Sequence, residues 1–275
     1  MTLQQALITA QAEGLARIDA QMLLLHTLGR AISDRAWLIT HDTDTLSPAA
    51  QEQFQALCLR RQAGEPVAYL TGSKAFYGLE LQVDARVLDP RPDTETLVDW
   101  ALEVLEGHPA PRLLDLGTGS GAIALALQKQ RPDATVLAVD ASQDALAVAR
   151  ANAECLGLPV QFHHGHWMQG LEGRFDAIVS NPPYIRSDDP HLTALQHEPL
   201  QALASGADGL EDIRAIIAQA PAHLEPGGWL LLEHGWDQAD AVCALLHSAG
   251  LEQVQGRKDL AGIVRCSGGQ RPTVK

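Results

Sequence analysis

Apolar side chains recur at helical spacing along the first part of the chain, up to residue 72, where no convincing strand is found. The positions that recur in this way are Leu3, Ala6, Leu7 and Ala10, followed by Ile18, Met22, Leu23 and Leu25. Ser47 and Pro48 resemble a helix start, because serine caps a first turn and the missing N–H of proline costs nothing there. We therefore expect residues 1–72 to form a small helical domain.

The pattern changes after Gly64-Glu65-Pro66. Residues 74–83 alternate between apolar and polar around a glycine, which predicts a hairpin, and we place a hairpin linker over residues 73–90. Beyond a helix from about Thr94 to Glu106, strands are expected at 112–116, 135–139, 159–163, 176–180, 229–234, 251–254 and 262–266, with helices at 122–130, 143–153, 212–224 and 238–248. This alternation predicts an α/β domain with a doubly wound, largely parallel sheet over residues 91–275. Such sheets bind ligands at the carboxyl ends of their strands.

A glycine-rich loop, Gly117-Thr118-Gly119-Ser120-Gly121, follows the first strand of this sheet and opens a helix. Glycines at alternate positions let the backbone turn sharply and lie flat against a ligand. Asp140 ends the next strand about twenty residues later, which is the spacing expected for a carboxylate that binds ribose hydroxyls. The loop and the carboxylate together indicate a nucleoside cofactor.

The same loop, with Ala122 in place of the last glycine, also fits a dinucleotide-binding enzyme. Asp115, two positions before the first glycine, favours S-adenosylmethionine instead. A carboxylate that faces the ligand suits the amino group of a methionine moiety and would repel pyrophosphate. We therefore expect S-adenosylmethionine as the cofactor, and a dinucleotide or a purely structural turn are the alternatives.

A rigid polar turn, Asn181-Pro182-Pro183-Tyr184, ends the strand expected at 176–180. Each proline fixes its own φ, removes a backbone N–H and restrains the residue before it. The turn leaves the side-chain oxygen of Asn181 and the carbonyl of Pro182 free to accept hydrogen bonds from one planar –NH2 group, whose flat face Tyr184 can cover. This chemistry suits the methylation of an amide or an exocyclic amine. An ordinary proline-rich loop is the alternative.

Composition narrows the class of protein. With 275 residues, 46% of them hydrophobic, the chain can form one large or two unequal domains around a substantial core. A formal charge of −14 disfavours extended binding to nucleic-acid phosphates, which needs many Lys and Arg contacts. The four cysteines are too far apart in the sequence for a metal-binding knuckle or a CxxC redox pair. We therefore expect them to be reduced thiols in a cytosolic protein. No leader pattern or long apolar run is found, so we expect a cytoplasmic location and no membrane span.

Combined, the D-L-G-T-G-S-G loop and the N-P-P-Y turn resemble the amino-group methyltransferases that use S-adenosylmethionine. The sequence is more closely similar to the protein-(glutamine-N5) methyltransferases that modify peptide-chain release factors, the PrmC/HemK family. N-P-P-Y alone also fits DNA adenine methyltransferases, but R-P-D-T-E ahead of the glycine loop points to the release-factor branch. Further segments that match, in this order, are Glu65–Gly72, Pro90–Glu95, Glu198-Pro199, Gly206–Leu210 and Gly227–Trp229.

The resemblance implies a helical N-terminal domain that helps dock the protein substrate and a seven-stranded methyltransferase domain. The implied reaction moves a methyl group to the glutamine nitrogen of the Gly-Gly-Gln motif in a release factor, and the implied partner is that release factor. Residues Gly117 to Gly121 would line the cofactor, Asp140 would hold its ribose and Trp167 would lie beside its adenine. Asn181 to Tyr184 would receive the substrate glutamine, and Asn181 would also touch the cofactor.

Two short segments need a separate interpretation. His166 stands where the family usually has an acidic residue that could bind the adenine amino group. His163, His164 and His166 make a metal site an alternative, although methyl transfer from a sulfonium needs no Lewis acid and we expect no metal. Gly268-Gly269-Gln270 reproduces the tripeptide that the family modifies. We expect it to be a chance sequence in a flexible end, with self-methylation as the alternative.

Three other functions stay open on the sequence alone. Adenine-N6 methylation of nucleic acid would use an N-P-P-Y turn equally well, but the net charge argues against it. A dinucleotide-dependent oxidoreductase would leave Asn181–Tyr184 unexplained, and a non-catalytic binding module would leave both motifs unused. Residues 186–205 fit either a mobile lid over the turn or a plain surface loop.

Overall fold

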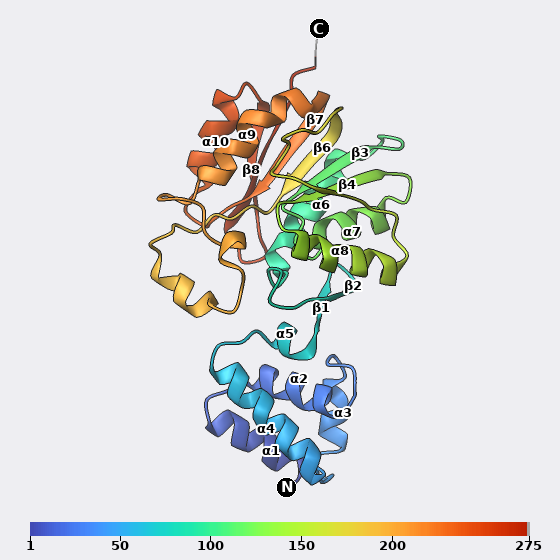
Figure 1. Cartoon of the computed structure of the whole chain (residues 1–275), viewed down its shortest axis with the longest axis vertical. Coiled ribbons are helices and arrows are strands. Elements are labelled where there is room, and N and C mark those ends of the chain that lie inside the picture. The colour runs from blue at the N-terminus through green and yellow to red at the C-terminus, as the bar shows by residue number, and fades with distance from the viewer. Residues whose placement is uncertain (274–275) are drawn as a thin grey trace. The chain divides into compact units, whose positions relative to one another are not determined.

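The computed structural model describes residues 1–273 (Figure 1). Its internal contacts divide the chain into two compact units. The first is Met1–Ser73 together with Ala194–His197, and the second is Lys74–Thr193 together with the described residues from Glu198 onward. The division after Ser73 falls one residue beyond the end that the sequence predicts for the helical domain.

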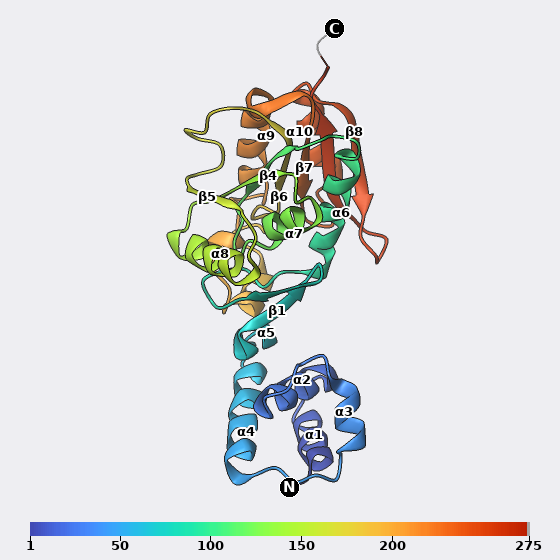
Figure 2. The ribbon, with the colours of Figure 1, turned by 90° about the vertical axis from the view of Figure 1, so that its right-hand side faces the viewer.

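The first unit is built from five helices: α1 (Leu3–Ala12), α2 (Arg17–Thr27), α3 (Arg35–Thr40), α4 (Pro48–Gln62) and α5 (Val67–Thr71) (Figure 2). Helix α2 contacts each of the others and buries three successive leucines, Leu23–Leu25, completely. At the start of α4 the Ser47 hydroxyl accepts a hydrogen bond from the Ala50 amide, and Pro48 fills the first helical position. The predicted helical character of this part of the chain is confirmed.

A hairpin and a helix open the second unit. Strands β1 (Ser73–Phe76) and β2 (Leu79–Gln82) pair across a turn in which Tyr77 and Gly78 both have positive φ, at 47° and 70°. Two left-handed residues match the twist of a tight hairpin, and glycine reaches this conformation without strain. A short 3-10 helix, η1 (Pro92–Thr94), then leads into α6 (Glu95–Val104). The hairpin expected over residues 74–83 is confirmed.

The second unit is organised around a seven-stranded sheet in the order β5-β4-β3-β6-β7-β9-β8. Its strands are β3 (Arg112–Leu116), β4 (Thr135–Asp140), β5 (Gln161–His164), β6 (Phe175–Ser180), β7 (Leu224–Glu233), β8 (Glu252–Lys258) and β9 (Val264–Gln270). Strands β3 to β7 pair in parallel, and β9 runs antiparallel to both β7 and β8. The predicted doubly wound α/β sheet is confirmed.

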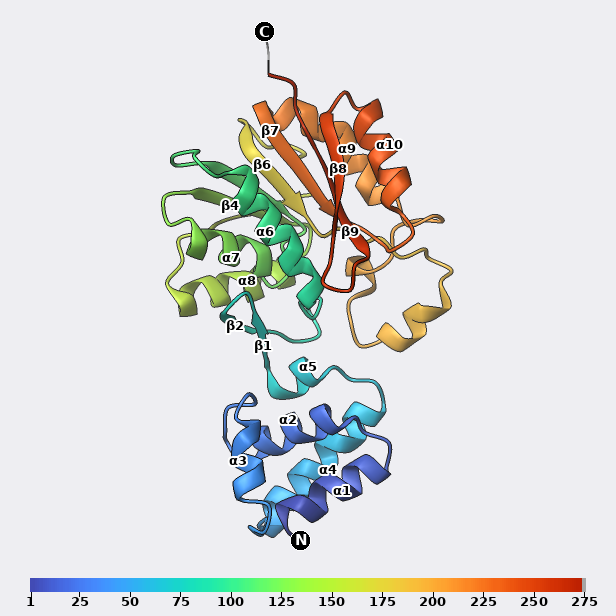
Figure 3. The ribbon, with the colours of Figure 1, turned by 180° about the vertical axis from the view of Figure 1, so that it is seen from behind.

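Helices cover both faces of this sheet, which is why most side chains of its central strands are apolar and buried. Helices α6, α7 (Ala122–Gln130) and α8 (Gln143–Leu156) cover one face, and α9 (Glu211–His223) and α10 (Ala239–Ser248) cover the other (Figure 3). Leu114, Ile178 and Leu230, from three neighbouring strands, are fully buried in the core under α9 and α10. None of the helices in residues 1–273 is long and apolar enough to cross a membrane.

The expected flexible end around Gly268-Gly269-Gln270 is wrong, because these residues form the last part of β9. A side chain at Gly268 would lie 2.6 Å from Leu231 of β7 and 2.8 Å from Trp100 of α6, so close packing requires glycine there. Strands β8 and β9 also run further than predicted. They form an antiparallel edge hairpin rich in polar residues, and such strands lack the continuous apolar run that marks a buried parallel strand.

Candidate functional site

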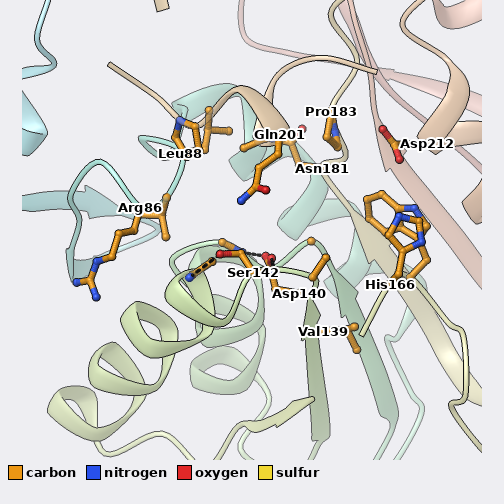
Figure 4. A pocket seen from close by; sticks show the side chains of 18 of the residues that line it. Arg86, Leu88, Val139, Asp140, Ser142, His166, Asn181, Pro183, Gln201 and Asp212 are labelled. Carbon is orange, nitrogen blue, oxygen red and sulfur yellow. Dashed lines mark hydrogen bonds between the residues drawn. The ribbon is translucent and has the colours of Figure 1, made fainter. Parts of the chain in front are cut away.

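A cavity of about 280 Å³ lies at the carboxyl ends of the central strands. It sits where the chain order reverses, since β4 lies on one side of β3 and β6 on the other. Gly117 and Gly119 after β3, Asp140 at the end of β4 and Asn181 after β6 all line it. Figure 4 shows Asp140 and Ser142 on one side of the cavity, with Asn181 and Pro183 facing them. The structure therefore brings the two predicted motifs to one site.

The glycine loop presents bare backbone to this cavity. The amides of Gly117 and Thr118 both donate to the carbonyl of Val139, at 2.9 and 3.0 Å, which ties the loop to the end of β4. Gly117 and Gly119 have φ values of +68° and +56°, a region that glycine adopts without strain. A Cβ built on Gly119 would meet no atom within 4 Å, because it would point into open space. This part of the loop can therefore lie directly against a ligand.

Asp140 is held by backbone amides on both carboxylate oxygens. Its Oδ2 accepts from the Gly119 amide at 2.9 Å and its Oδ1 from the Ser142 amide at 2.8 Å. Burial raises the pKa of this carboxyl above the ordinary value, although these amides act in the opposite direction. A carboxylate has about four acceptor sites, so two remain for hydroxyl groups of a ligand. Asp140 therefore fits the ribose-binding role that the sequence predicts.

Asp115 lies beneath the loop and does not line the cavity, although it is one of the predicted cofactor residues. Its Oδ2 accepts from the Thr118 hydroxyl at 2.6 Å and from the Ala124 amide at 3.2 Å, so it fastens the loop to the start of α7. Its Oδ1 is buried and has no hydrogen-bond partner in the described chain. Burial raises the pKa of this carboxyl to about 7. Because this oxygen is free, it could accept a hydrogen bond from the amino group of a ligand. That role stays a prediction.

The other predicted loop residues that do not line the cavity shape its wall. Thr118 binds Asp115 as described, and the Ser120 carbonyl accepts from Asn152 at 2.9 Å. Gly121 directly precedes helix α7 as its N-cap, with φ +85°, and a Cβ there would lie 3.0 Å from Leu125. These three residues therefore position the loop from behind instead of facing the cavity.

Trp167 and His166 line the part of the cavity that lies next to the glycine loop. A Cβ on Gly117 would lie 3.4 Å from the Trp167 ring, so the ring packs against the loop backbone. The His166 ring meets the Trp167 ring edge-on, with 5.4 Å between ring centroids. His164 turns elsewhere and hydrogen-bonds the Ala141 carbonyl at 2.9 Å. No group of three His, Cys, Asp or Glu side chains within residues 1–273 is arranged to hold a metal ion.

Asn181 is anchored through one end of its amide only. Its Nδ2 donates to the Thr94 hydroxyl oxygen at 3.2 Å, whereas its Oδ1 accepts no hydrogen bond from any described residue. The strand before it is fixed by the Ser180 hydroxyl, which donates to the Leu116 carbonyl at 2.7 Å. The Asn181 oxygen is thus a held but unused acceptor in a cavity-lining residue.

Pro183 lines the cavity, but Pro182 and Tyr184 do not appear in its lining. The Tyr184 hydroxyl makes a long hydrogen bond of 3.5 Å to Glu233 at the end of β7. The Tyr184 carbonyl accepts from the side-chain Nε2 of Gln238 at 3.0 Å, which fixes the turn from the side of α10. The predicted cover of Tyr184 over a substrate amide therefore stays a prediction.

Two protein-family models match the chain: residues 3–72 match the PrmC N-terminal domain and residues 95–206 match the methyltransferase small domain. The release factor glutamine methyltransferase of Xylella fastidiosa strain Temecula1 is 52% identical over 271 residues, which cover 97% of this chain and 98% of the relative. The enzyme of the same name from Bordetella pertussis is 51% identical over 260 residues, or 93% of this chain and 95% of the relative. The chain belongs to the release factor glutamine methyltransferase family.

Solved structures share the fold of this family member. A methyltransferase from Pyrococcus furiosus is 22% identical, with a TM-score of 0.54 over 79% of this chain and 98% of that chain. The predicted enzyme class and S-adenosylmethionine as its cofactor are confirmed by the family. The cavity of this release factor glutamine methyltransferase family member fits that cofactor, since it offers bare glycine backbone, open acceptor sites on Asp140 and an unpaired Asp115 oxygen just below.

Sequence reasoning missed several residues that line the cavity in this family member. Among them are Arg86, Val87, Leu88, Ser142, Pro199, Gln201, Ala202 and Asp212. Ser142 could have been found, because it stands two residues after Asp140 and caps helix α8. Asp212 lies in the first turn of α9, Gln201 and Ala202 belong to a short 3-10 helix (Leu200–Ala202), and the remaining residues come from loops. Among them, Pro199, Gln201 and Ala202 belong to the 186–205 segment, so part of that segment does border the site.

Proposed function

We propose that this protein transfers a methyl group from S-adenosylmethionine to the side-chain amide nitrogen of the glutamine in the Gly-Gly-Gln motif of peptide-chain release factors. Its relatives from Xylella fastidiosa and Bordetella pertussis carry the name release factor glutamine methyltransferase and match nearly its full length. The observation that carries the proposal is the Asn181 amide, anchored through its nitrogen to Thr94 with its oxygen left unused beside the cavity.

When bound, S-adenosylmethionine supplies a methyl group on a positively charged sulfur, which needs no metal or covalent enzyme intermediate. The residues that would hold it are those of the glycine loop, chiefly Gly117 and Gly119, with Asp140 accepting the ribose hydroxyls. Trp167 would provide an apolar wall for the adenine, with His166 beside it. Asp115 would accept from the amino group through its free Oδ1.

The contribution of the Asn181 turn is orientation of a poor nucleophile. An amide nitrogen reacts only when its lone pair is aimed at the electrophile, and good positioning can supply up to roughly 7–11 kcal/mol. The Asn181 Oδ1 and the Pro182 carbonyl would accept the two amide hydrogens of the substrate glutamine. The nitrogen would form a bond to the methyl carbon as the bond from that carbon to sulfur breaks, which leaves S-adenosylhomocysteine, and one of the two hydrogens would leave as a proton. As that amide becomes more cationic along the reaction, these acceptors bind it more strongly, which lowers the barrier selectively.

The helical unit of residues 1–73 would serve to dock the folded release factor, because the described residues there offer no reactive constellation and match the PrmC N-terminal domain. All four cysteines of the described chain are free, in keeping with the cytoplasm, where release factors act during translation. The proposed partner is therefore a cytoplasmic protein.

The proposal is tested by incubating purified release factor with this protein and isotope-labelled S-adenosylmethionine, followed by peptide mass spectrometry. We expect one added methyl group on the glutamine of Gly-Gly-Gln. A release factor with that glutamine replaced by alanine is the matched control and should take up no label. Label on other residues, or label found on adenine of added nucleic acid instead, would overturn the proposed substrate.

A further inference from the structure

A buried asparagine of helix α8 links two walls of the cavity from outside it. Asn152 is only 1% exposed and does not appear in the cavity lining. Its Nδ2 donates to the Gln82 carbonyl at 3.0 Å and to the Ser120 carbonyl at 2.9 Å, and its Oδ1 accepts from the Gln82 amide at 2.7 Å. Both hydrogens and the oxygen of this side chain are therefore used, and they join segments 70 and 32 residues away in the sequence.

One end of this link is Gln82, the last residue of strand β2. A strand residue can present its N–H and C=O to the same neighbour, and a primary amide offers the complementary donor and acceptor. Asn152 therefore binds Gln82 as a neighbouring strand would. The chain runs from Gln82 directly into the segment of residues 83–88. Within this 83–88 segment, Arg86 and Leu88 line one side of the cavity (Figure 4).

The other end of the link is the glycine loop. In a continuous helix, the Ala124 amide would donate to the carbonyl four residues earlier, which is that of Ser120. Here the Ala124 amide donates to Asp115 instead, at 3.2 Å. The hydrogen that the Ser120 carbonyl receives comes from the Asn152 side chain. Ser120 follows Gly119, which lines the cavity, so Asn152 fixes the loop directly behind its exposed backbone.

Helix α8 also holds Asp140, the proposed ribose ligand. The Ser142 amide just before this helix donates to Asp140 at 2.8 Å, and Asn152 lies in the second half of the helix. The helix therefore ties Asp140, the glycine loop and the 83–88 segment to one element. Because the spacing between these parts is set before a ligand arrives, less conformational freedom is lost on binding.

We propose that Asn152 is a positioning residue of the cofactor site, which sets the spacing between the glycine loop and the 83–88 segment. This role rests on the proposed function, because it takes the cavity as the site of S-adenosylmethionine. All three hydrogen bonds of Asn152 go to parts other than the Asn181 turn. Its loss should therefore weaken cofactor binding and leave the methyl-transfer step largely unchanged once the cofactor is bound.

The first test measures the Kd for S-adenosylmethionine by calorimetry in wild type and in Asn152→Ala. We expect the Kd to rise ~10-fold or more, because a tenfold change corresponds to about the net contribution of one hydrogen bond and three are lost. With saturating cofactor and release factor, kcat should stay within a few-fold of wild type. An unchanged Kd in Asn152→Ala overturns the positioning role.

Gln128→Ala is the matched control for a simple loss of stability. Gln128 is a buried amide of α7, 2% exposed, whose Nε2 donates to the carbonyls of Arg131 and Ala134 at 3.3 and 3.4 Å. These contacts involve neither the glycine loop nor the 83–88 segment. We expect Gln128→Ala and Asn152→Ala both to lower Tm, but only Asn152→Ala to weaken cofactor binding. A similar rise in Kd in both variants would overturn the positioning role, because lower stability alone would account for it.

The second test uses Gln82, so that the result does not depend on the folding of Asn152→Ala. Gln82 binds Asn152 through its backbone only. Gln82→Pro removes the N–H that donates to Asn152, whereas Gln82→Ala keeps it. We expect the Kd for S-adenosylmethionine to rise severalfold in Gln82→Pro and to stay at the wild-type value in Gln82→Ala. Equal Kd values in these two variants would contradict a link through the hairpin.

Hydrogen exchange measures the link without release factor. When S-adenosylmethionine binds to wild type, exchange should slow for the glycine-loop amides and also for the Gln82 amide, because Asn152 joins them. In Asn152→Ala only the loop amides should slow. A wild-type Gln82 amide that does not respond to the cofactor overturns the proposed link. A wild-type enzyme that shows these binding effects but leaves release factor unmethylated would instead overturn the proposed function and leave the role of Asn152 intact.

Discussion

The Arg91 guanidinium donates to the carboxylate of Glu198 at 2.5 Å, across 107 residues of sequence. The other oxygen of Glu198 accepts from the Asp89 amide at 3.2 Å, and Asp89 itself pairs with Lys74 at 3.0 Å. Glu198 directly precedes Pro199, which lines the cavity. The ion pair thus fixes one wall of the cofactor site to the segment that ends in Thr94.

Glu198→Gln should therefore loosen this wall. Its side chain is 3% exposed but that of Arg91 is 35% exposed, so solvent screens part of the pair and we expect a loss of only about 1–3 kcal/mol in the free energy of unfolding. The Kd for S-adenosylmethionine should rise as well. Urea denaturation and calorimetry measure the two effects. Arg214→Gln, which breaks the exposed pair with Asp208, should change neither.

Asp140→Ala should weaken S-adenosylmethionine binding by roughly 1.5–3 kcal/mol, because charge-assisted hydrogen bonds to the ribose are lost. Acidification should weaken wild-type binding at a higher pH than for an ordinary aspartate, since burial raises the pKa of Asp140 and protonation removes the charge. Calorimetry across pH 4–7 would detect this. Asp144→Ala, on the exposed first turn of α8, is the control and should bind normally. Unchanged affinity in Asp140→Ala would refute the assigned pocket.

Gly119→Val should nearly abolish cofactor binding, because the side chain would both strain a backbone at φ +56° and enter the cavity. Gly157→Val offers a close comparison, since Gly157 has φ +65° and equally open surroundings but lies at the end of α8. Both variants should lower Tm by similar amounts. Only Gly119→Val should fail to bind S-adenosylmethionine in equilibrium dialysis, and similar binding by the two would place the cofactor elsewhere.

Asn181→Ala should leave folding and most of the cofactor affinity intact but reduce kcat/KM by ~100-fold or more, as expected when a contact made chiefly in the transition state is removed. Asn181→Asp keeps the shape and an acceptor but adds a negative charge beside the sulfonium, so the substrate should bind in a displaced position and methyl transfer should slow. Steady-state kinetics with release factor as substrate separates the effect on KM from the effect on kcat. Transfer within a few-fold of wild type in Asn181→Ala would rule out the catalytic role of the turn.

The central strands and the glycine loop could be predicted because their signals are local. Short apolar runs mark parallel strands buried on both faces, and Gly117, Asp140 and Asn181 stand at strand ends that such a sheet brings together. The contact of Asn181 with Thr94 and that of Tyr184 with Glu233 join three separate segments and leave no pattern in any of them. The packing of Ala194–His197 into the helical unit, where His197 bonds the Ala63 carbonyl at 3.0 Å, was equally hidden.

The position of Gln270 in a paired strand bears on whether the enzyme can methylate its own Gly-Gly-Gln tripeptide. The Gln270 Nε2 donates to the Gly227 carbonyl at 2.8 Å, and its Oε1 accepts from Gln253 at 2.5 Å. In the sheet register Gln270 lies beside Trp229 and hence level with Ala177, whereas Asn181 follows the far end of β6. A newly synthesised copy therefore displays the Gly-Gly-Gln tripeptide only until β9 pairs with its neighbours. Once β9 is paired, these hydrogen bonds hold the Gln270 side chain in the sheet, so we expect the folded enzyme not to methylate this glutamine.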